Sequence, residues 1–312
     1  MLDKHISSCV SLSLLLTQYT LSCSKDQHIY CMIFDFYNQF GALNSKNVFN
    51  SFAAGLKTLG HTVEYHSGKG DVAVIWSVLW HGRMRSNQTI MNRYRERGKS
   101  VIVIEIGSLR RDISPAGTDL LSTWKIGING INLPHFFVSG KSSERFEKLG
   151  LKLDPWKNNG TNILICSQHE RSEQWANMPK TDVWVLEKIK QIREHTDRPI
   201  RIRSHPRFPI RRSFNEYNAV PSTGNFKAEL NNAWAVVNHC SGPGIEAILA
   251  GVPAFVGNVS LAAPVANLSM TTINSPLMPD RTQWANDLAW TEWTQQEMVQ
   301  GIPQKLICDK LM

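Results

Sequence analysis

The amino-acid sequence predicts an α/β protein built from two doubly wound parallel sheets, each in its own domain. Short apolar segments alternate with segments of helical period, this alternation occurs twice, and a polar stretch, residues 152–160, separates the two runs. Strands that alternate with helices of this length form βαβ units and a parallel sheet. A chain of 312 residues is long enough for two domains of ordinary size, each with its own core.

The first run of alternating segments begins after an expected N-terminal extension, residues 1–27. Residues 113–158 are loop-rich and contain the stretch WKIGINGIN and a charged helix near residues 142–150. Ligands of parallel sheets bind at the carboxyl ends of the strands, so we expect functional loops at residues 35–41, 80–85 and 105–111. The expected strands are residues 29–36, 61–66, 71–80 and 101–106, and the expected helices are residues 48–59 and 87–97.

The second run follows the polar linker. The Trp-rich residues 280–301 are predicted to form an amphipathic helix whose Trp290 and Trp293 pack in a core. The predicted domains are residues 28–155 and 156–285, followed by a helical tail, residues 286–312. The expected strands are residues 162–167, 200–203 and 235–238, and the expected helices are residues 183–195, 226–231 and 245–250.

The stretch WAVVNHCSGPGIEAILAGVPAFV, residues 234–256, is predicted to form a strand, a tight turn, a short helix and a second strand. Ser241 suits a helix N-cap, and Pro243 suits the first helical turn. Gly242 and Gly244 leave the backbone bare for a ligand, and free N–H groups at a helix start bind anions such as phosphate. Glu246, one turn inside, can accept both hydroxyls of a ribose. The alternative is a plain turn in which Glu246 only favours the helix dipole.

A second motif lies roughly one βα unit upstream. The segment RIRSHPR, residues 201–207, ends an apolar-basic strand with His-Pro and arginines. Followed by the strand, SGPG turn and helix, it resembles the donor-nucleotide half of GT-B glycosyltransferases. The likeness is to bacterial surface-polysaccharide transferases and to phage transferases that add sugars to hydroxymethylated DNA bases. It implies two Rossmann-like domains facing each other across a cleft, with a C-terminal helix that can return to the first domain.

The resemblance also implies how a sugar donor is held. GT-B enzymes grip the leaving nucleoside diphosphate with basic side chains and a helix N-terminus rather than a metal ion. No DxD pair follows a strand, so the sequence predicts no metal and no cofactor, only a nucleotide-sugar co-substrate, expected to be UDP-linked. His205 has the alternative role of capping its strand beside Pro206. The expected donor-binding residues are Arg201, Arg203, His205, Ser241, Gly242, Gly244 and Glu246.

Candidate acceptor-side residues follow the strands of the first domain. Glu105 emerges from an apolar strand, where a carboxylate is costly unless it is used or paired. It could take the proton of an attacking hydroxyl, or it could form a salt bridge with Arg110 or Arg111. Asp35 is the competing base. The pair Asn129 and Asn132 is expected to contact sugar or acceptor, or else to make hydrogen bonds within the loop.

Charge favours a polyanionic partner, because 34 Lys and Arg residues against 26 Asp and Glu residues give a net charge of +8. Trp80 and His81 could stack on a base flipped out of a DNA helix. A solvated helix face explains residues 93–97 equally well. The basic residues that could form a phosphate-binding stripe are Arg83, Arg85, Arg93, Arg95, Arg97, Lys99, Arg110 and Arg111.

The leading hypothesis from the sequence is a metal-independent glycosyltransferase that modifies the hydroxymethyl group of cytosine in phage double-stranded DNA. Such an enzyme would act as a monomer in the cytoplasm of an infected bacterial cell. The first alternative keeps the fold and takes a surface polysaccharide or an oligosaccharide as acceptor. The second is a nucleotide- or DNA-binding module without catalysis.

The six cysteines include no CxxC pair, so a zinc site is not expected. Cys166 and Cys240 lie in apolar strand contexts and are predicted to be buried thiols, as in a reducing compartment. No stretch of the sequence is long enough and apolar enough to predict a membrane span.

Overall fold

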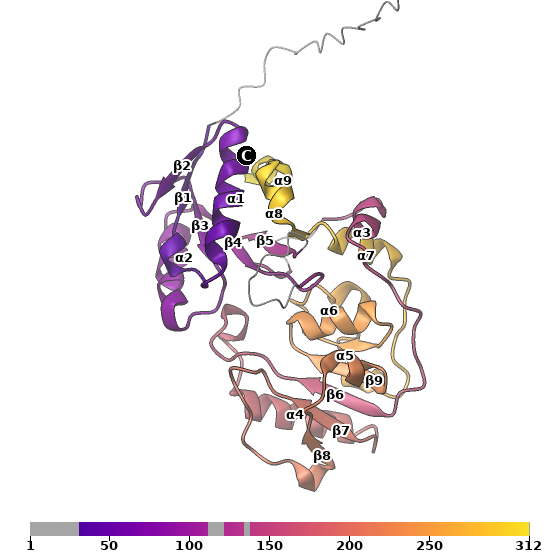
Figure 1. The fold of residues 1–312 in the computed structure, drawn as a ribbon. Helices are drawn as coiled ribbons and strands as arrows, with labels where there is room; N and C mark the ends of the chain where they lie inside the picture. The colour runs from indigo at the N-terminus through magenta and orange to yellow at the C-terminus, as the bar shows by residue number, and fades with distance from the viewer. Residues whose placement is uncertain (1–30, 112–121, 134–137, 312) are drawn as a thin grey trace, which may run out of the picture. The chain divides into compact units, whose positions relative to one another are not determined.

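The computed structural model describes residues 31–111, 122–133 and 138–311, which form two β-sheets with helices on their faces (Figure 1). The expected extension at residues 1–27 lies outside these ranges. Both predicted sheets are present, which confirms the α/β class. The boundaries proposed for the two domains stay predictions.

The first sheet has the strand order β11-β5-β4-β3-β1-β2. Its parallel part consists of β1 (Ile33–Phe36), β2 (Thr62–Tyr65), β3 (Val72–Trp76) and β4 (Ser100–Ile106). The strand order reverses between β1 and β3, so the loops after these two strands diverge. Such a switch point is where open α/β sheets hold ligands.

Helix α1 (Ser45–Thr58) covers one face of this parallel part and α2 (Arg85–Glu96) covers the other (Figure 1). Phe34 and Val74 pack with α1, whereas Ala73 and Ile75 pack with α2. Successive strand residues alternate between the two cores because side chains of a strand point to opposite faces. The near-continuous apolar runs of these strands follow from burial on both faces.

Residues 124–132 differ from the expected irregular loop. Trp124–Ile128 form strand β5, which pairs antiparallel with β4. Ile126 and Trp124 face the α1 core, so the segment has the two-residue period of a strand. The two glycines in this short stretch hid that period in the sequence, and pairing with β4 supplies the order that local propensity lacks.

The second sheet has the order β10-β9-β6-β7-β8, and all its strands are parallel. The order reverses between β6 and β9, which places a second switch point at their carboxyl ends. The carboxyl end of β9 leads directly into α6. The strands of this second sheet are β6 (Asn162–Cys166), β7 (Ile200–Arg203), β8 (Ala219–Pro221), β9 (Ala233–Asn238) and β10 (Ala254–Phe255).

Helix α4 (Thr181–Arg193) packs on one face of the second sheet, and α5 (Phe226–Leu230) and α6 (Gly242–Leu249) pack on the other. The expected thiols Cys166 and Cys240 are both buried, which confirms that prediction. Burial raises the pKa of the Cys240 thiol to about 12, so this cysteine is protonated at neutral pH.

The C-terminal segment returns to the first sheet, as the family resemblance implied. The single helix expected over residues 280–301 is instead divided into α7 (Thr282–Leu288), β11 (Glu292–Trp293) and α8 (Gln295–Val299). Strand β11 pairs antiparallel with β5, and α8 and α9 (Ile302–Leu311) lie beside α1 (Figure 1). The predicted core position of Trp293 is confirmed, since its side chain is fully buried.

Helix α3 (Glu144–Lys148) contacts α7. No helix among the described residues is long and apolar enough to cross a membrane. Short 3₁₀ helices complete the fold: Asn38–Phe40, Gly82–Met84, Glu173–Trp175, Asn215–Tyr217, Ala263–Val265 and Met270–Thr272.

Candidate functional site

The turn between β9 and α6 lies at the switch point of the second sheet. Ser241 occupies the N-cap position of α6, as predicted, but its side chain caps no amide. Its hydroxyl accepts a hydrogen bond from Asn238 Nδ2 (2.8 Å), and its own amide donates to Asn238 Oδ1 (2.8 Å). Asn238 therefore fixes the turn. The side chain of Ser241 does not bond to the amides of the first helical turn, which stay available to an anion.

Gly242 and Gly244 are bare because neighbours approach them closely. A Cβ atom on Gly244 would lie 3.0 Å from Val256 Cγ1, so the glycine lets the helix start pack against the residue that follows β10. A Cβ atom on Gly242 would lie 3.3 Å from Glu246 Oε1 and 3.4 Å from Ser108 Oγ. The carboxylate of Glu246 therefore folds back over the start of its own helix, beside the loop that follows β4.

Burial raises the pKa of Glu246 above its ordinary value. The cations of Arg111, Lys227 and Arg203 oppose this shift, while the carboxylate of Glu292 adds to it. A partly buried carboxylate that interacts with three cations is not a solvated residue of a helix face. It is placed to accept hydrogen bonds from a polar ligand at the helix start, with cations near enough to attract a phosphate.

The two arginines of β7 have different surroundings. Arg203 Nη1 donates to the carbonyl of Gly224 (2.7 Å) and pairs with Glu229 Oε2 (3.3 Å). Arg201 is exposed and lies two residues farther from the carboxyl edge, about 6.6 Å along the strand. The structure therefore brings Arg203 near Glu246 and leaves Arg201 apart from it.

A chain of contacts along the carboxyl edge connects His205 to the α6 turn. The amide of His205 donates to Ser167 Oγ (3.0 Å), and the amide of Cys240 donates to Gln168 Oε1 (3.3 Å). Residues 167 and 168 follow β6 directly, so they lie between the ends of β7 and β9. His205 thus belongs to the same edge as the anion-binding turn.

Three imidazoles gather at this edge. The rings of His169 and His205 are 5.2 Å apart, and those of His81 and His169 are 6.0 Å apart. Burial, together with the nearby His205, His81 and two arginines, lowers the pKa of His169 to about 4, so this ring is neutral at pH 7. The Nδ1 atoms of His169 and His205 accept backbone amides, which leaves each Nε2 as a hydrogen-bond donor.

The loop after β4 reaches this site from the first sheet. Glu292 of β11 is fully buried and accepts the amides of Ser108 (2.6 Å) and Leu109 (3.0 Å). Arg111 Nε donates to the carbonyl of Gly107 (2.8 Å), and Arg110 Nη1 donates to the carbonyl of Leu149 (3.1 Å). Of this predicted pair, Arg111 is the one that interacts with Glu246.

Glu105 is the second-to-last residue of β4 and is partly exposed. Its cross-strand neighbour is Lys125, which is buried and interacts electrostatically with the Cys240 thiol beside the α6 turn. The alternative salt bridge of Glu105 with Arg110 or Arg111 does not form; the ion pairs of the described residues are found elsewhere.

Asp35, the competing base, is fully buried in the first sheet. Its carboxylate accepts the amides of Ser67 (3.0 Å) and Gly68 (2.7 Å) and the hydroxyls of Tyr37 (2.8 Å) and Tyr94 (3.1 Å). Burial raises the pKa of Asp35, but these hydrogen bonds outweigh it and hold the pKa below its ordinary value. This carboxylate ties β1 to the loop after β2, and its four hydrogen bonds are those of a structural group.

Asn129 and Asn132 have separate roles. Asn129, with φ near 59°, accepts the amide of Val101 (2.8 Å), so it lies at the amino edge of β4, away from the site. Asn132 is buried, and its side chain contacts the thiol of Cys240. Asn129 therefore makes a hydrogen bond within the protein, as in the alternative role that the sequence offered. Asn132 instead lies beside the α6 turn.

Most basic residues of the predicted phosphate-binding stripe bond to other groups of the protein. Arg83 and Arg85 are exposed, and no hydrogen bond to their side chains is found within the described ranges. Trp80 packs against the α2 core, and His81 is exposed and contacts Arg171 Nη1 (2.6 Å). The other six basic residues each bond to a neighbour: Arg93, Arg95, Arg97, Lys99, Arg110 and Arg111.

Sequence reasoning missed Gln168, His169, Lys227 and Glu292. His169 follows β6 by three residues, and the rule that ligands bind at carboxyl ends could have identified it. Lys227 and Glu292 have no such signal because tertiary packing brings them to the site. Among the described residues, no cluster of His, Cys, Asp and Glu could hold a metal ion.

No family model and no curated protein sequence matches this chain. The fold is similar to that of a β-Kdo 2,4 transferase, KpsC of Thermosulfurimonas dismutans, with a TM-score of 0.52 and 14% identity over 82% of this chain and 89% of that chain. The β-Kdo 2,7 transferase of the same organism's KpsC has a TM-score of 0.44 and 14% identity over 88% and 99% of the two chains. The glycosyltransferase SnogD of Streptomyces nogalater has a TM-score of 0.26 and 11% identity over 90% and 98%. With its two sheets, its returning C-terminal segment and the first of these likenesses, the chain has the GT-B fold of paired Rossmann-like domains.

Proposed function

We propose that this chain is a glycosyltransferase that takes its sugar from a nucleotide sugar. The observation that carries this proposal is the α6 start, where two glycines, a partly buried carboxylate and three cations meet at a switch point. The diphosphate would lie at the first turn of α6, and Glu246 would accept the ribose hydroxyls. The GT-B fold supports the same reaction.

In this reaction the acceptor oxygen attacks the anomeric carbon, the bond from that carbon to the diphosphate breaks, and the acceptor proton passes to a base. Negative charge builds on the departing diphosphate, and the helix start with Arg203, Lys227 and Arg111 would stabilise it. His205 and His169 would donate from Nε2 to phosphate oxygens. Among the predicted residues, Arg201 has the weakest structural support in this role.

We assign the base to Glu105 because its carboxylate is partly exposed and its cross-strand neighbour lies beside the α6 turn. Asp35 is the weaker candidate, since four donors already occupy its oxygens. Glu105→Gln is therefore expected to lower kcat by about a hundredfold or more while leaving nucleotide affinity unchanged. Nucleotide titration by calorimetry and turnover of the donor separate the two quantities.

The donor assignment is tested by calorimetric titration with UDP, UDP-glucose and CMP in the presence of EDTA. We expect UDP to bind without added metal, and Glu246→Gln to weaken binding by about tenfold, since a hydrogen bond to a charged group is lost. Glu187→Gln, an exposed change on α4, is the matched control. Absence of nucleotide binding by the wild-type chain would contradict the proposal. Tighter binding of CMP than of UDP would instead make the donor a cytidine nucleotide.

For the acceptor, we propose a glycan first. The fold likeness to KpsC, which is a Kdo transferase, supports a polysaccharide or oligosaccharide acceptor. The hydroxymethyl group of modified cytosine in phage DNA is the second candidate, favoured by the net charge of +8 and by exposed Arg83 and Arg85 beside His81. That acceptor would place the reaction in the cytoplasm of an infected bacterial cell.

One experiment distinguishes the two acceptors. The chain is incubated with several nucleotide sugars and either hydroxymethylcytosine DNA or capsular oligosaccharides, and the products are weighed by mass spectrometry. A heavier nucleoside after digestion supports the DNA acceptor, and a lengthened oligosaccharide supports the glycan. If both remain unmodified while UDP binds, the non-catalytic nucleotide-binding alternative gains support.

A further inference from the structure

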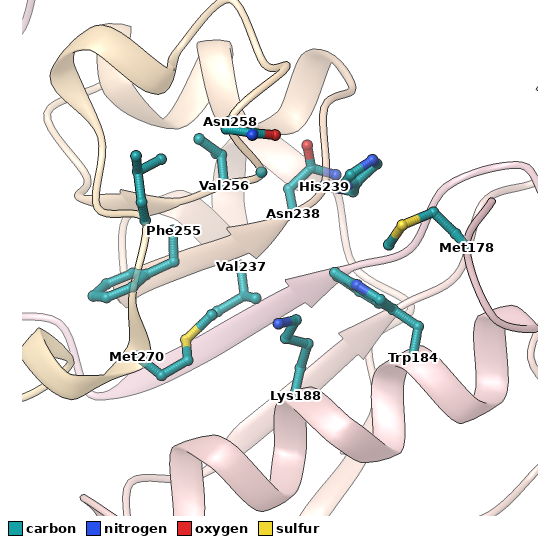
Figure 2. Close-up of a pocket in the computed structure, with 12 residues that line it drawn as sticks. Met178, Trp184, Lys188, Val237, Asn238, His239, Phe255, Val256, Asn258 and Met270 are labelled. Carbon is teal, nitrogen blue, oxygen red and sulfur yellow. The ribbon is translucent and has the colours of Figure 1, made fainter. Parts of the chain in front are cut away.

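A cavity of about 350 Å³ lies between α4 and the carboxyl ends of β9 and β10 (Figure 2). Its volume is within the range of small-molecule sites in proteins. The walls are mainly apolar and include Trp184 of α4, Phe255 of β10, Met178 and Met270. An apolar ring or a branched chain placed there would be removed from water on several sides.

The cavity contains one cation and no carboxylate. Lys188 of α4 lines it, and Figure 2 shows its side chain directed from the helix toward β9. Its ammonium donates to Gln191 Oε1 (2.9 Å), and none of the ion pairs among the described residues includes it. Burial lowers the pKa of Lys188, although the carboxylate of the neighbouring Glu187 on α4 opposes this shift. Burial likewise lowers the pKa of His239, so that ring is neutral at pH 7.

Most of this cavity lies on the α4 face of β9, whereas the α6 turn follows the other face, and Asn238 borders both. The side chain of Asn238 bonds to Cys166 and Ser241 on the α6 side. Val237, one residue earlier, packs in the α4 core and lines the cavity. Neither Glu246 nor Arg203 belongs to the cavity wall. The α4 side of the cavity, which carries Lys188, is therefore separate from the α6 start, and a ligand held there would approach the α6 turn only at Asn238.

We infer that this cavity is a second small-molecule site, and that its ligand is a monoanion with an apolar, ring-sized body, such as an aromatic carboxylate or sulfonate. The apolar wall binds the body of the ligand, and Lys188 pairs with its acidic group. A dianion or a neutral polar molecule is disfavoured because the wall offers a single cation and few free donors.

The test uses two fluorescent probes that share an apolar body. The first, 8-anilino-1-naphthalenesulfonate, carries one negative charge, and the second, N-phenyl-1-naphthylamine, is its uncharged counterpart. We expect the wild-type chain to bind the anionic probe at one site, and Lys188→Met to weaken that binding about tenfold while leaving the neutral probe unaffected. Lys190→Met, an exposed change on the same helix, is the matched control and is expected to alter neither affinity.

Met270→Trp is a second variant, designed to fill the cavity, and it is expected to abolish binding of both probes. Thermal unfolding of each variant establishes that the fold is retained. The inference is overturned if Lys188→Met and Lys190→Met have equal effects, or if Met270→Trp binds the probes as the wild type does. It is also overturned if UDP displaces the anionic probe competitively, since the cavity would then belong to the nucleotide site. The readout does not depend on glycosyl transfer.

Discussion

At the scale of the residue, the two carboxylates Glu246 and Asp35 show opposite ways of burying a charge. Asp35 accepts four hydrogen bonds, and its pKa is lowered in spite of burial. Glu246 is partly buried near three cations, but no hydrogen bond to its carboxylate is found among the described residues, and its pKa is raised. A carboxylate of the first kind stabilises a fold, whereas one of the second kind is available to a ligand.

Glu246→Gln is expected to stabilise the free protein at neutral pH. Because the folded pKa of Glu246 is raised, the folded state holds the proton more tightly than the unfolded chain does. Stability therefore falls as the pH rises from the ordinary value near 4.5 through the folded pKa, and the loss is complete above it. The variant should unfold at a higher temperature than the wild type at pH 8 and gain nothing at pH 4. A lower melting temperature at pH 8 would contradict this account.

Asp35→Asn should lower the free energy of unfolding by about 3 kcal/mol at pH 7, because the amide cannot accept from all four donors. The folded pKa of Asp35 is lowered, so the stability it contributes is present above the ordinary value near 3.8 and is lost as the pH falls through the folded pKa. Urea unfolding at pH 7 and pH 3 measures both effects. Unchanged stability with abolished turnover would instead make Asp35 the base.

At the scale of the element, the C-terminal segment holds two parts of the molecule in place. Arg145 of α3 is buried and donates to both oxygens of Glu297 and to the carbonyls of Ala289 and Glu292, and its guanidinium lies 4.0 Å from the Trp293 ring centroid. Glu297 also closes a capping box with Thr294 at the start of α8. Trp293, Thr294 and Glu297, together with Arg145, thus form a structural clamp.

Arg145→Met is expected to cost about 3–5 kcal/mol of unfolding free energy, since it leaves the buried carboxylate of Glu297 without its cation. Adding Glu297→Gln should cost less than the sum of the two single changes. The exposed pair of Arg95 and Glu173 is the control, and Arg95→Met should cost less than about 1 kcal/mol. Additive effects in urea unfolding of the buried pair would contradict the clamp.

Glu292→Gln tests the link between β11 and the loop after β4. Its carboxylate accepts the amides of Ser108 and Leu109, and an amide side chain can replace only one of these acceptors well. Hydrogen exchange of residues 107–111 is expected to become about tenfold faster, while exchange in β4 stays as in the wild type. Glu96→Gln on α2 is the exposed control, and equal exchange in all three proteins would refute the link.

At the scale of the whole molecule, the net charge of +8 overstates the free positive surface, since six of the eight residues of the predicted stripe are bonded internally. Within that stripe, Arg83 and Arg85 are the two residues whose side chains have no hydrogen bond in the described part of the chain. With two phosphate contacts from the stripe, the slope of log K against log salt for double-stranded DNA should be about −2, whereas eight contacts would give about −7. Gel shifts at several salt concentrations measure it. A slope near −7 would instead support the phosphate-binding stripe of eight residues.

Much of the fold was predictable because β7 and the apolar strands on either side have strong local patterns. Strand β7 was predicted with its observed bounds, and the returning C-terminal segment was implied by the family resemblance. Strand β5 and the division of residues 280–301 were missed because each depends on pairing between segments far apart in sequence. The site was predictable at the α6 turn, where glycines and Glu246 lie close together in the chain.

The sequence by itself determined the two alternations of strand and helix and the bare helix start after β9, because both arise from residues only a few positions apart. Only the tertiary structure decided which charged groups reach that helix start. Lys227, Arg111 and Glu292 come from three separate parts of the chain. Arg201 lies apart from the helix start because it is two residues farther along β7 from the carboxyl edge. Long-range packing sets these distances, and the electrostatic energy between charges depends on distance rather than on order along the chain.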